Sequence, residues 1–510
     1  MSPPLPLPPA GPGAPTPPIE LAGGAAAATQ RLGAERVEVR DDLLARLRDA
    51  CADVTVEPAA LAEASRDWWP LAMAWATSGQ VAGLAAAVAR PTDAGQVAAV
   101  LALCDEARVP VTAAGGRSGV CGASVPLHGG VVLDLTAMVG IVHVDATSLV
   151  LDVLPGTFGD VLEHELRRDH DATLGHWPQS VALSTVGGWL ACRSAGQLSG
   201  RYGKIEDMVL GLDVALADGR RITTGGWPRA AVGPDLTQLF VGSEGTLGVI
   251  TGARLRLHPA PRHERRGAWL LPDFDDGLDT MRRIVQRGAT PAVLRLYDAA
   301  EAQRTYGTGD RALLLVLDEG DGTLVDATLE VVAEECELRG GGSRSDEAHV
   351  EHWLAHRNDV AALEALTSKG YTVDTMEVSA SWSDLPAIHR ATVDALLGVE
   401  GTIAASAHQS HSYPTGGCLY FTFAGQVEAA RRDDYYRQVW DAGQRSVLAR
   451  GGALSHHHGV GLNRARYMAE ALGPALDVLA ATKAALDPHG ILNPGKLGLS
   501  SPWAGGADGW

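Results

Sequence analysis

Apolar and polar residues in the first half of the chain follow the periods of one helix and several strands. Asp93 and Gln96 have the spacing of a capping box, which predicts that a helix begins there. The apolar residues of this helix recur at helical spacing, at Val97, Val100, Leu101 and Cys104. Short apolar runs predict strands at 109–112, 130–135, 149–154 and 210–217. The last of these strands turns at Asp218-Gly219, a strong hairpin signal.

A shift in composition at 259–267 marks the start of a second region. Apolar runs there predict strands at 269–271, 292–296, 313–317 and 419–423, and helical spacing predicts helices at 278–286, at 324–336 and from Glu428. Elements in this order favour an antiparallel sheet covered on one face. We therefore predict an α+β chain with domains at 86–262 and 263–497. A disordered Pro/Ala-rich leader (1–35), a helical segment (36–85) and a tail (498–510) complete the predicted chain.

The segment RDWWPLAMAWATSG, just before the first domain, is rich in tryptophan and poor in charge. It has two interpretations. Either it packs on the neighbouring domain, which we favour, or it is an interfacial helix that inserts Trp68, Trp69 and Trp75 into lipid.

Charge and cysteine usage narrow the class of protein. With 42 basic and 61 acidic side chains the formal charge is −19, which argues against a nucleic-acid partner. The 6 cysteines are scattered without a CxxC pair, a pattern typical of a reducing compartment. The proline-rich start lacks the features of a secretory signal, so we expect a cytoplasmic protein. A homodimer is expected on base rates.

The predicted strand at 109–112 leads into the glycine-rich stretch AAGGRSG (113–119). Glycines let successive backbone N–H groups converge on an anion, so such a loop suits a phosphate. By itself the loop is a weak signal, and it is not a Rossmann fingerprint, because no GxGxxG opens a helix here.

Three further motifs follow the loop in order: STVGG at 184–188, GPDL at 233–236 and GSEGTLGVIT at 242–251. This series resembles the FAD domain of the vanillyl-alcohol-oxidase and p-cresol methylhydroxylase (PCMH) superfamily. The resemblance implies a two-domain flavoprotein, with an α/β domain that binds FAD and an α+β cap domain that carries an antiparallel sheet.

The resemblance also implies which residues hold FAD. The first loop would bind the pyrophosphate, and it comprises Thr112, Ala113, Ala114, Gly115, Gly116, Arg117 and Ser118. The isoalloxazine and ribityl chain would contact Gln179, Ser180, Val181, Ala182, Leu183, Ser184, Thr185, Cys192, Arg193, Ser194 and Ala195. The adenine side would contact Glu244, Gly245, Thr246, Leu247, Gly248, Val249 and Ile250.

Motifs in both domains are similar to those of the alkyldihydroxyacetone-phosphate synthase (alkylglycerone-phosphate synthase) family. They are STVGGW, YGKIED, GPDL, VLRLYD, CLYFTFA and SHHHGVG. That family exchanges the acyl group of acyl-dihydroxyacetone phosphate for a fatty alcohol, with FAD taking part and no net redox change. The resemblance implies an ether-lipid precursor as product and a lipid-like substrate, with peripheral membrane contact left open.

Candidate catalytic residues follow from the same resemblance. His456, His457 and His458 would form a cluster of bases, and Tyr420 and Arg295 match a tyrosine and an arginine that the family needs. Arg357 corresponds to a phosphate-binding arginine of the family, in a stretch where the loop lengths differ.

The main alternative is an FAD-dependent 2-hydroxyacid dehydrogenase of the D-lactate or glycolate type, which shares the fold and the LNPGK stretch near the C-terminus. Such enzymes hold a metal with two histidines and a glutamate. Here Tyr420 falls at the second histidine and His457 at the glutamate. His411 and His457 alone would form a poor site, so we expect no metal. A third alternative, a flavin-binding partner without catalysis, does not explain the histidine cluster.

The first prediction concerns the attachment of FAD. In some relatives of the superfamily a histidine after the paired glycines binds the flavin covalently, and Arg117 stands at that position here. We therefore expect acid or heat to release FAD from the yellow protein. A link from the cap domain stays open, and flavin that co-precipitates with the polypeptide would reveal covalent attachment.

Overall fold

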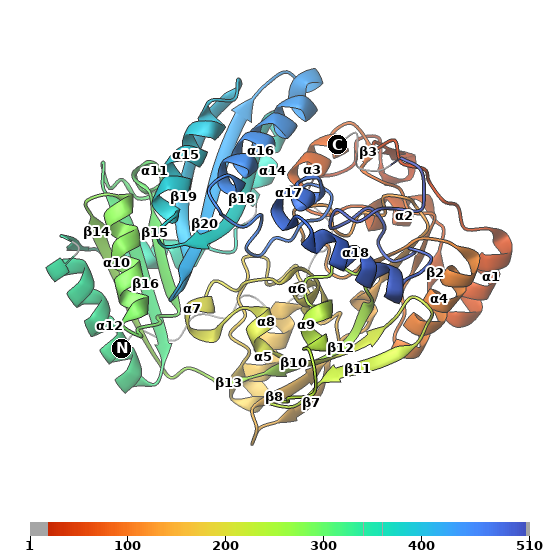
Figure 1. Cartoon of the computed structure of the whole chain (residues 1–510), viewed down its shortest axis with the longest axis horizontal. Coiled ribbons are helices and arrows are strands. Elements are labelled where there is room, and N and C mark those ends of the chain that lie inside the picture. Colours follow the sequence, from red (N-terminus) through yellow and green to blue (C-terminus); the bar gives the residue numbers. More distant parts are fainter. Residues whose placement is uncertain (1–18, 340, 360, 506–510) are drawn as a thin grey trace.

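The computed structural model describes residues 19–339, 341–359 and 361–505, so the first half of the expected leader and the end of the tail lie outside the described residues. The second half of the leader is ordered, contrary to the prediction, because Ile19 and Leu21 are buried in a small core and β1 (Thr29–Gln30) pairs with β3 (Gln80–Val81). Figure 1 shows the FAD-side domain in red to yellow and the cap domain in green to blue. Within the described chain, no helix is long and apolar enough to cross a membrane.

Two sheets build the first domain. The smaller has the order β2-β4-β6-β5. Its strands β4 (Ala87–Ala89), β6 (Val131–Asp134) and β5 (Val111–Ala114) run parallel, and β2 (Val54–Thr55) pairs antiparallel with β4. The larger has the order β11-β10-β12-β8-β7 and is antiparallel throughout. Its strands are β7 (Ile141–Asp145), β8 (Val150–Val153), β10 (Val209–Ala215), β11 (Arg221–Gly225) and β12 (Val249–Arg256). The predicted first helix is α4 (Ala94–Ala107), and the Asp93 carboxylate accepts hydrogen bonds from the Gly95 and Gln96 amides as its cap.

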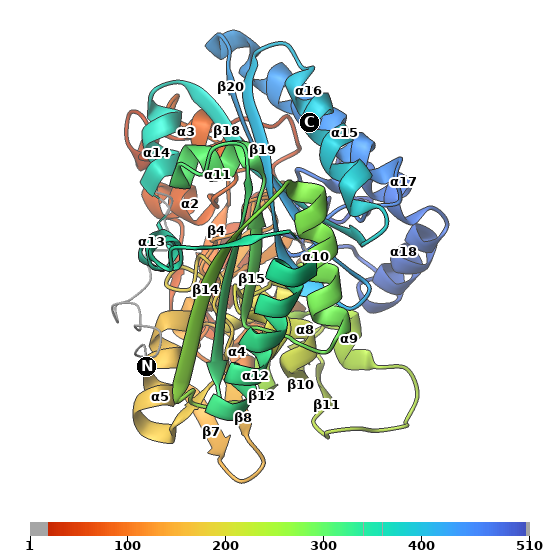
Figure 2. The ribbon, with the colours of Figure 1, turned by 90° about the vertical axis from the view of Figure 1, so that its left-hand side faces the viewer.

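The cap domain carries a seven-stranded antiparallel sheet, as predicted, with the order β17-β14-β16-β15-β19-β20-β18. Besides β16, its strands are β14 (His263–Leu271), β15 (Val293–Tyr297), β17 (Ser343–Ser345), β18 (Tyr371–Ser381), β19 (Thr402–Tyr413) and β20 (Gly416–Gln426). Side chains of its central strand β16 (Ala312–Gly320) alternate between two cores. Leu314 and Val316 pack with the cap helices, whereas Leu313, Leu315 and Leu317 pack with the first domain. One face of the sheet therefore carries the helices α10 (Phe274–Gln286), α12 (Gly322–Glu334), α15 (Leu385–Leu397) and α16 (Arg432–Leu448), and the other face packs on the first domain (Figures 1 and 2).

The tryptophan-rich segment is packed inside the fold. Trp68, Trp69 and Trp75 are 6%, 0% and 5% exposed. Trp69 Nε1 donates to the Tyr436 hydroxyl at 3.0 Å, and Trp75 Nε1 donates to Asp433 at 2.9 Å. The short helix α3 (Pro70–Ala76) is thereby joined to α16 of the cap, which confirms the packing interpretation of this segment.

Candidate active site

A cavity of about 650 Å³ lies between the two domains. The glycine-rich loop and the motifs at 184–188 and 242–251 form one wall, and the cap strands form the other. Most residues implied to bind FAD line it: Ala113, Ala114, Gly115, Gly116, Arg117, Ser118, Gln179, Ser180, Leu183, Ser184, Thr185, Cys192, Ser194, Ala195, Glu244, Gly245, Gly248, Val249 and Ile250. A cavity of this size is typical of a small-molecule or cofactor site.

Seven of the site residues that the resemblance implies do not line this cavity, namely six residues implied to bind FAD and the implied base His456. Four of them have buried side chains that belong to the core: Thr112, which lies within β5, and Val181, Thr246 and Leu247. Arg193 points away and donates to the Val241 carbonyl. Ala182 and His456 are likewise absent from the lining. Their assignments came from contiguous motifs, and the alternation of side-chain directions within a motif explains why not every member faces the ligand.

The loop at 115–119 is built for an anion. Within the described residues, the backbone N–H groups of Gly115 through Gly119 make no hydrogen bond to another protein group. A Cβ at Gly115 would collide with the Thr185 hydroxyl, and one at Gly116 would lie on the Leu183 carbonyl oxygen. The loop therefore passes close to the segment at 183–185 with its donors free, which fits the pyrophosphate of FAD.

Arg117 fixes this loop to the end of β6 through its side chain. Its backbone is left-handed, with φ of 51°, and its guanidinium donates to Asp134 at 3.2 Å. Burial raises the pKa of Asp134, but Arg117 and the Thr136 hydroxyl outweigh it and keep the pKa below its usual value. A charged pair at this place anchors the loop to β6.

Arg295 projects from β15 (Val293–Tyr297) into the cap side of the cavity. Its Nε donates to the Tyr297 hydroxyl at 2.7 Å, and its Nη2 lies 2.7 Å from His408 Nε2. His408 Nδ1 lies 3.1 Å from a Glu301 carboxylate oxygen. Because a guanidinium can only donate, His408 Nε2 accepts, and the proton of the neutral ring is on Nδ1. The network leaves Arg295 Nη1 for a ligand.

Tyr420, on β20 (Gly416–Gln426), faces the same cavity. Its hydroxyl donates to Thr375 at 3.0 Å and lies 3.5 Å from His458 Nε2, and its ring stacks on His408. Burial raises the pKa of the phenol well above its usual value. Tyr420 is therefore a neutral proton donor beside a histidine.

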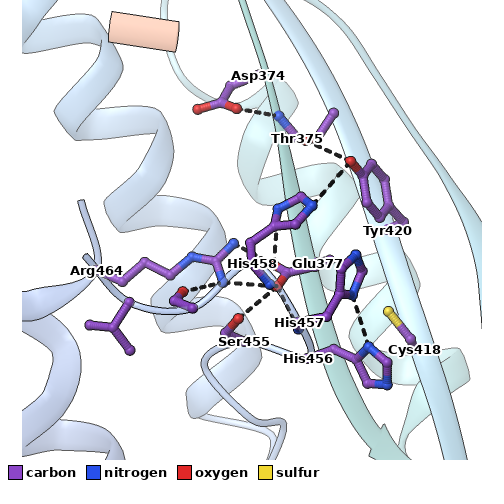
Figure 3. A network of polar contacts seen from close by, with 12 residues as sticks. Asp374, Thr375, Glu377, Cys418, Tyr420, Ser455, His456, His457, His458 and Arg464 are labelled. Carbon is purple, nitrogen blue, oxygen red and sulfur yellow. Dashed lines mark hydrogen bonds and ion pairs between the residues drawn. The ribbon is translucent and has the colours of Figure 1, made fainter. Parts of the chain in front are cut away.

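The histidine loop, defined here as residues 455–461, is held by charged side chains from three distant segments. Glu377 on β18 (Tyr371–Ser381) accepts from the amides of His457 and His458 at 3.0 and 2.6 Å (Figure 3). Lys204 donates to the His456 carbonyl at 2.7 Å, and Glu244 accepts from the Val460 amide at 2.6 Å. His457 and His458 line the cavity.

His411, His456 and His457 come together behind this loop, with ring nitrogens within 4.8 Å of one another. The fold thus adds His456 to the pair that the sequence suggested. A metal ion needs ring lone pairs that converge in the ring planes, but the rings of His411 and His456 stack with an interplanar angle of 23°. His456 also uses both nitrogens, for the Tyr413 hydroxyl at 2.7 Å and for His457 at 2.9 Å. This geometry is that of a hydrogen-bonded stack rather than a ligand set.

Arg357 follows α13 (Ala348–His356) and lines the cavity while 7% exposed. Its guanidinium donates to Gln197 at 3.3 Å and lies between the rings of Trp177 and Trp353. Burial lowers the pKa of Arg357 to about 10. No carboxylate of the described chain pairs with it, so an anionic ligand is its natural partner.

Two sequence families match the chain. The family described as "FAD binding domain" matches residues 85–225, and "FAD linked oxidases, C-terminal domain" matches residues 260–497. The uncharacterised FAD-linked oxidoreductase YgcU of Escherichia coli K12 is 31% identical over 76% of this chain and 83% of its own length. Glycolate oxidase subunit GlcD of Bacillus subtilis is 29% identical over 81% and 88%. Alkyldihydroxyacetonephosphate synthase of Trypanosoma brucei is 28% identical over 82% and 73%.

Solved structures with the same fold include an alkyldihydroxyacetonephosphate synthase, with a TM-score of 0.76 at 22% identity, covering 94% of this chain and 90% of that one. A p-cresol methylhydroxylase has a TM-score of 0.74 at 19% identity, covering 92% and 99%. At these identities the likeness shows the fold alone. The fold and the family matches together establish FAD as the cofactor.

The second prediction tests the loop. We expect Gly116→Ala to abolish FAD binding, because the new methyl group would displace the loop from the Leu183 carbonyl. Gly33→Ala is the matched control, since a Cβ there meets nothing within 4 Å and Gly33 does not line the cavity. The flavin absorbance per protein after gel filtration measures the difference, and equal flavin content in the two variants would contradict the assignment.

Proposed function

The chain belongs to the PCMH-type superfamily of FAD-linked oxidases, and from this premise we propose that it is a redox-neutral enzyme of the alkyldihydroxyacetonephosphate-synthase type. It would exchange the acyl group of acyl-dihydroxyacetone phosphate for a fatty alcohol. The observation that carries the proposal is the placement of Tyr420, His458 and Arg295 on the cap wall of the FAD cavity. The Trypanosoma brucei relative supports it at the level of the whole chain.

The chain's own residues have distinct tasks in such a reaction. Bound FAD supplies an electron-poor ring at which a substrate carbon can react. Arg357 would bind the phosphate, and Arg295 would hold the oxygen of the carbonyl or of the leaving carboxylate through its unused Nη1. Tyr420 would move the proton next to the carbonyl, with His458 beside it as base. Burial lowers the pKa of His458, so this ring is neutral and able to accept a proton.

A specific observation favours the alternative, an FAD-linked oxidoreductase that acts on a short hydroxy acid. From residue 295 onward, the lining is mainly aromatic, charged or hydroxylated, and its aliphatic members are Leu366 and Val373. Such a wall suits a polar substrate better than a long alkyl chain. The similarity to a glycolate oxidase subunit supports the same alternative.

The third prediction separates the two functions. Acyl-dihydroxyacetone phosphate and a long-chain alcohol should give an ether and a free fatty acid, with no added electron acceptor and no effect of a chelator. Anaerobic D-lactate, glycolate or 2-hydroxyglutarate should leave the flavin oxidised. If one of these acids bleaches the flavin and a dye restores it over many cycles, the oxidoreductase function is correct. Loss of activity on chelation would also count against the synthase function.

The fourth prediction concerns Arg295. An ammonium cannot donate to Tyr297, His408 and a ligand in the planar geometry of a guanidinium, so Arg295→Lys should lose activity while retaining FAD. Charged hydrogen bonds contribute about 1.5–3 kcal/mol, so we expect a loss of roughly tenfold or more in turnover. Arg450→Lys is the control, because Arg450 is exposed, lies just beyond α16 and, among the described residues, donates through its guanidinium only to Ser446 of that helix. Turnover equal to that of the control would make Arg295 structural.

A further inference from the structure

We propose that Glu377 is a positioning residue that fixes the tautomer of His458, so that a carboxylate, an imidazole and the Tyr420 phenol form one proton relay at the cavity wall. The relay deepens the proposed function, because it assigns the base that receives the proton of Tyr420, and in that respect it rests on that function.

The carboxylate of Glu377 is charged and immobile. It is 0% exposed and forms an ion pair with Arg464, which is also 0% exposed (Figure 3). Arg464 Nη1 donates to Glu377 Oε1 at 3.1 Å and to the Gly459 carbonyl at 3.1 Å. The Ser455 hydroxyl donates to the same carboxylate oxygen at 2.6 Å. Burial alone would raise the pKa of Glu377, but the charge of Arg464 and the hydrogen bonds from Arg464 and Ser455 outweigh it and hold the pKa far below its usual value.

His458 lies between this carboxylate and Tyr420. Its Nδ1 is 3.7 Å from Glu377 Oε2 and has no hydrogen-bond partner in the described part of the chain, and its Nε2 is 3.5 Å from the Tyr420 hydroxyl. A bare lone pair on Nδ1 would face a fixed negative charge, whereas an N–H there is attracted to it. The neutral ring therefore carries its proton on Nδ1, and its Nε2 lone pair faces the phenol.

Tyr420 then has two acceptors for one proton. In the resting structure its hydroxyl donates to Thr375 Oγ1 at 3.0 Å. When the phenol takes a proton from the substrate, its own O–H bond breaks and an N–H bond forms at His458 Nε2. The resulting imidazolium lies beside the Glu377 carboxylate, which stabilises it, and the reverse transfer restores the starting state. The step needs no oxidant, reductant or metal.

The arrangement explains why a buried charge pair is placed here. A neutral amide at residue 377 could still accept from the His457 and His458 amides, but its NH₂ group could donate to His458 Nδ1. The histidine proton would then move to Nε2 and block transfer from the phenol. In serine proteases the corresponding change of a carboxylate to an amide costs about 10⁴-fold in turnover for this reason.

The experiment uses the FAD-bound protein labelled with ¹⁵N-histidine. Two-bond ¹H–¹⁵N correlations identify the tautomer of His458, whose signals are assigned by their loss in His458→Asn. We expect Nδ1–H in the wild type and Nε2–H in Glu377→Gln. Turnover of Glu377→Gln with the synthase substrates should fall about 10²–10⁴-fold, with KM changed far less than kcat.

Asp318→Asn is the matched control, because Asp318 is 0% exposed and pairs with Arg201 away from the cavity. It should change stability but neither the His458 tautomer nor kcat. If Glu377→Gln does not retain FAD, the double variant Glu377→Gln/Arg464→Gln is used instead, because it leaves no unpaired buried charge. The tautomer of His458 in the double variant then tests the relay by the same spectrum. An Nε2–H signal in the wild type, or an unchanged tautomer in the variant, would overturn the relay. The expected tautomers without synthase turnover would instead refute the proposed function alone.

Discussion

The buried ion pair between Glu377 and Arg464 is the interaction on which the candidate site depends. Glu377 lies on a cap strand, and Arg464 follows the histidine loop, so the pair joins segments that are far apart in sequence. Removing one member of a buried pair commonly costs about 3–5 kcal/mol, because the other charge is left without a partner. The pair therefore restricts the histidine loop to one position relative to the cap sheet.

Other charges extend this restriction to the FAD side of the cavity. Glu244, from the loop that lines the FAD wall, accepts from the Val460 and Gly461 amides, and Lys204 donates to the His456 carbonyl. The histidine loop thus contacts the cap sheet and the two segments of the first domain that carry Lys204 and Glu244. Because one face of the cap sheet packs on its helices and the other on the FAD-side domain, Tyr420, His458 and the glycine loop face one cavity.

Local patterns predicted much of this fold. The capping signal at Asp93, the hairpin at Asp218-Gly219 and the apolar runs of the cap correspond to observed elements, because each depends on neighbouring residues. The sequence did not reveal β18 or β19 (Thr402–Tyr413), although both flank Tyr420 on β20. β18 carries the buried residues Asp374 and Glu377, whose polar side chains would be expected at the surface from the sequence alone. Their partners Tyr436, Trp440 and Arg464 come from distant parts of the chain.

The residues of the candidate site, like the elements of the fold, were predicted where a local motif marks them and missed where only distant contacts do. Motifs located Arg295, Tyr420 and the histidine loop, but not His408 and Glu301, which fix the orientation of Arg295 through contacts that only the fold creates. The central claim is that this wall moves protons in a reaction without net redox change. The most direct test is the electron yield: fatty acid released and dye reduced are counted together during anaerobic turnover with an added dye. The account predicts fatty acid release with no dye reduction, whereas one electron pair delivered for each product molecule would contradict it.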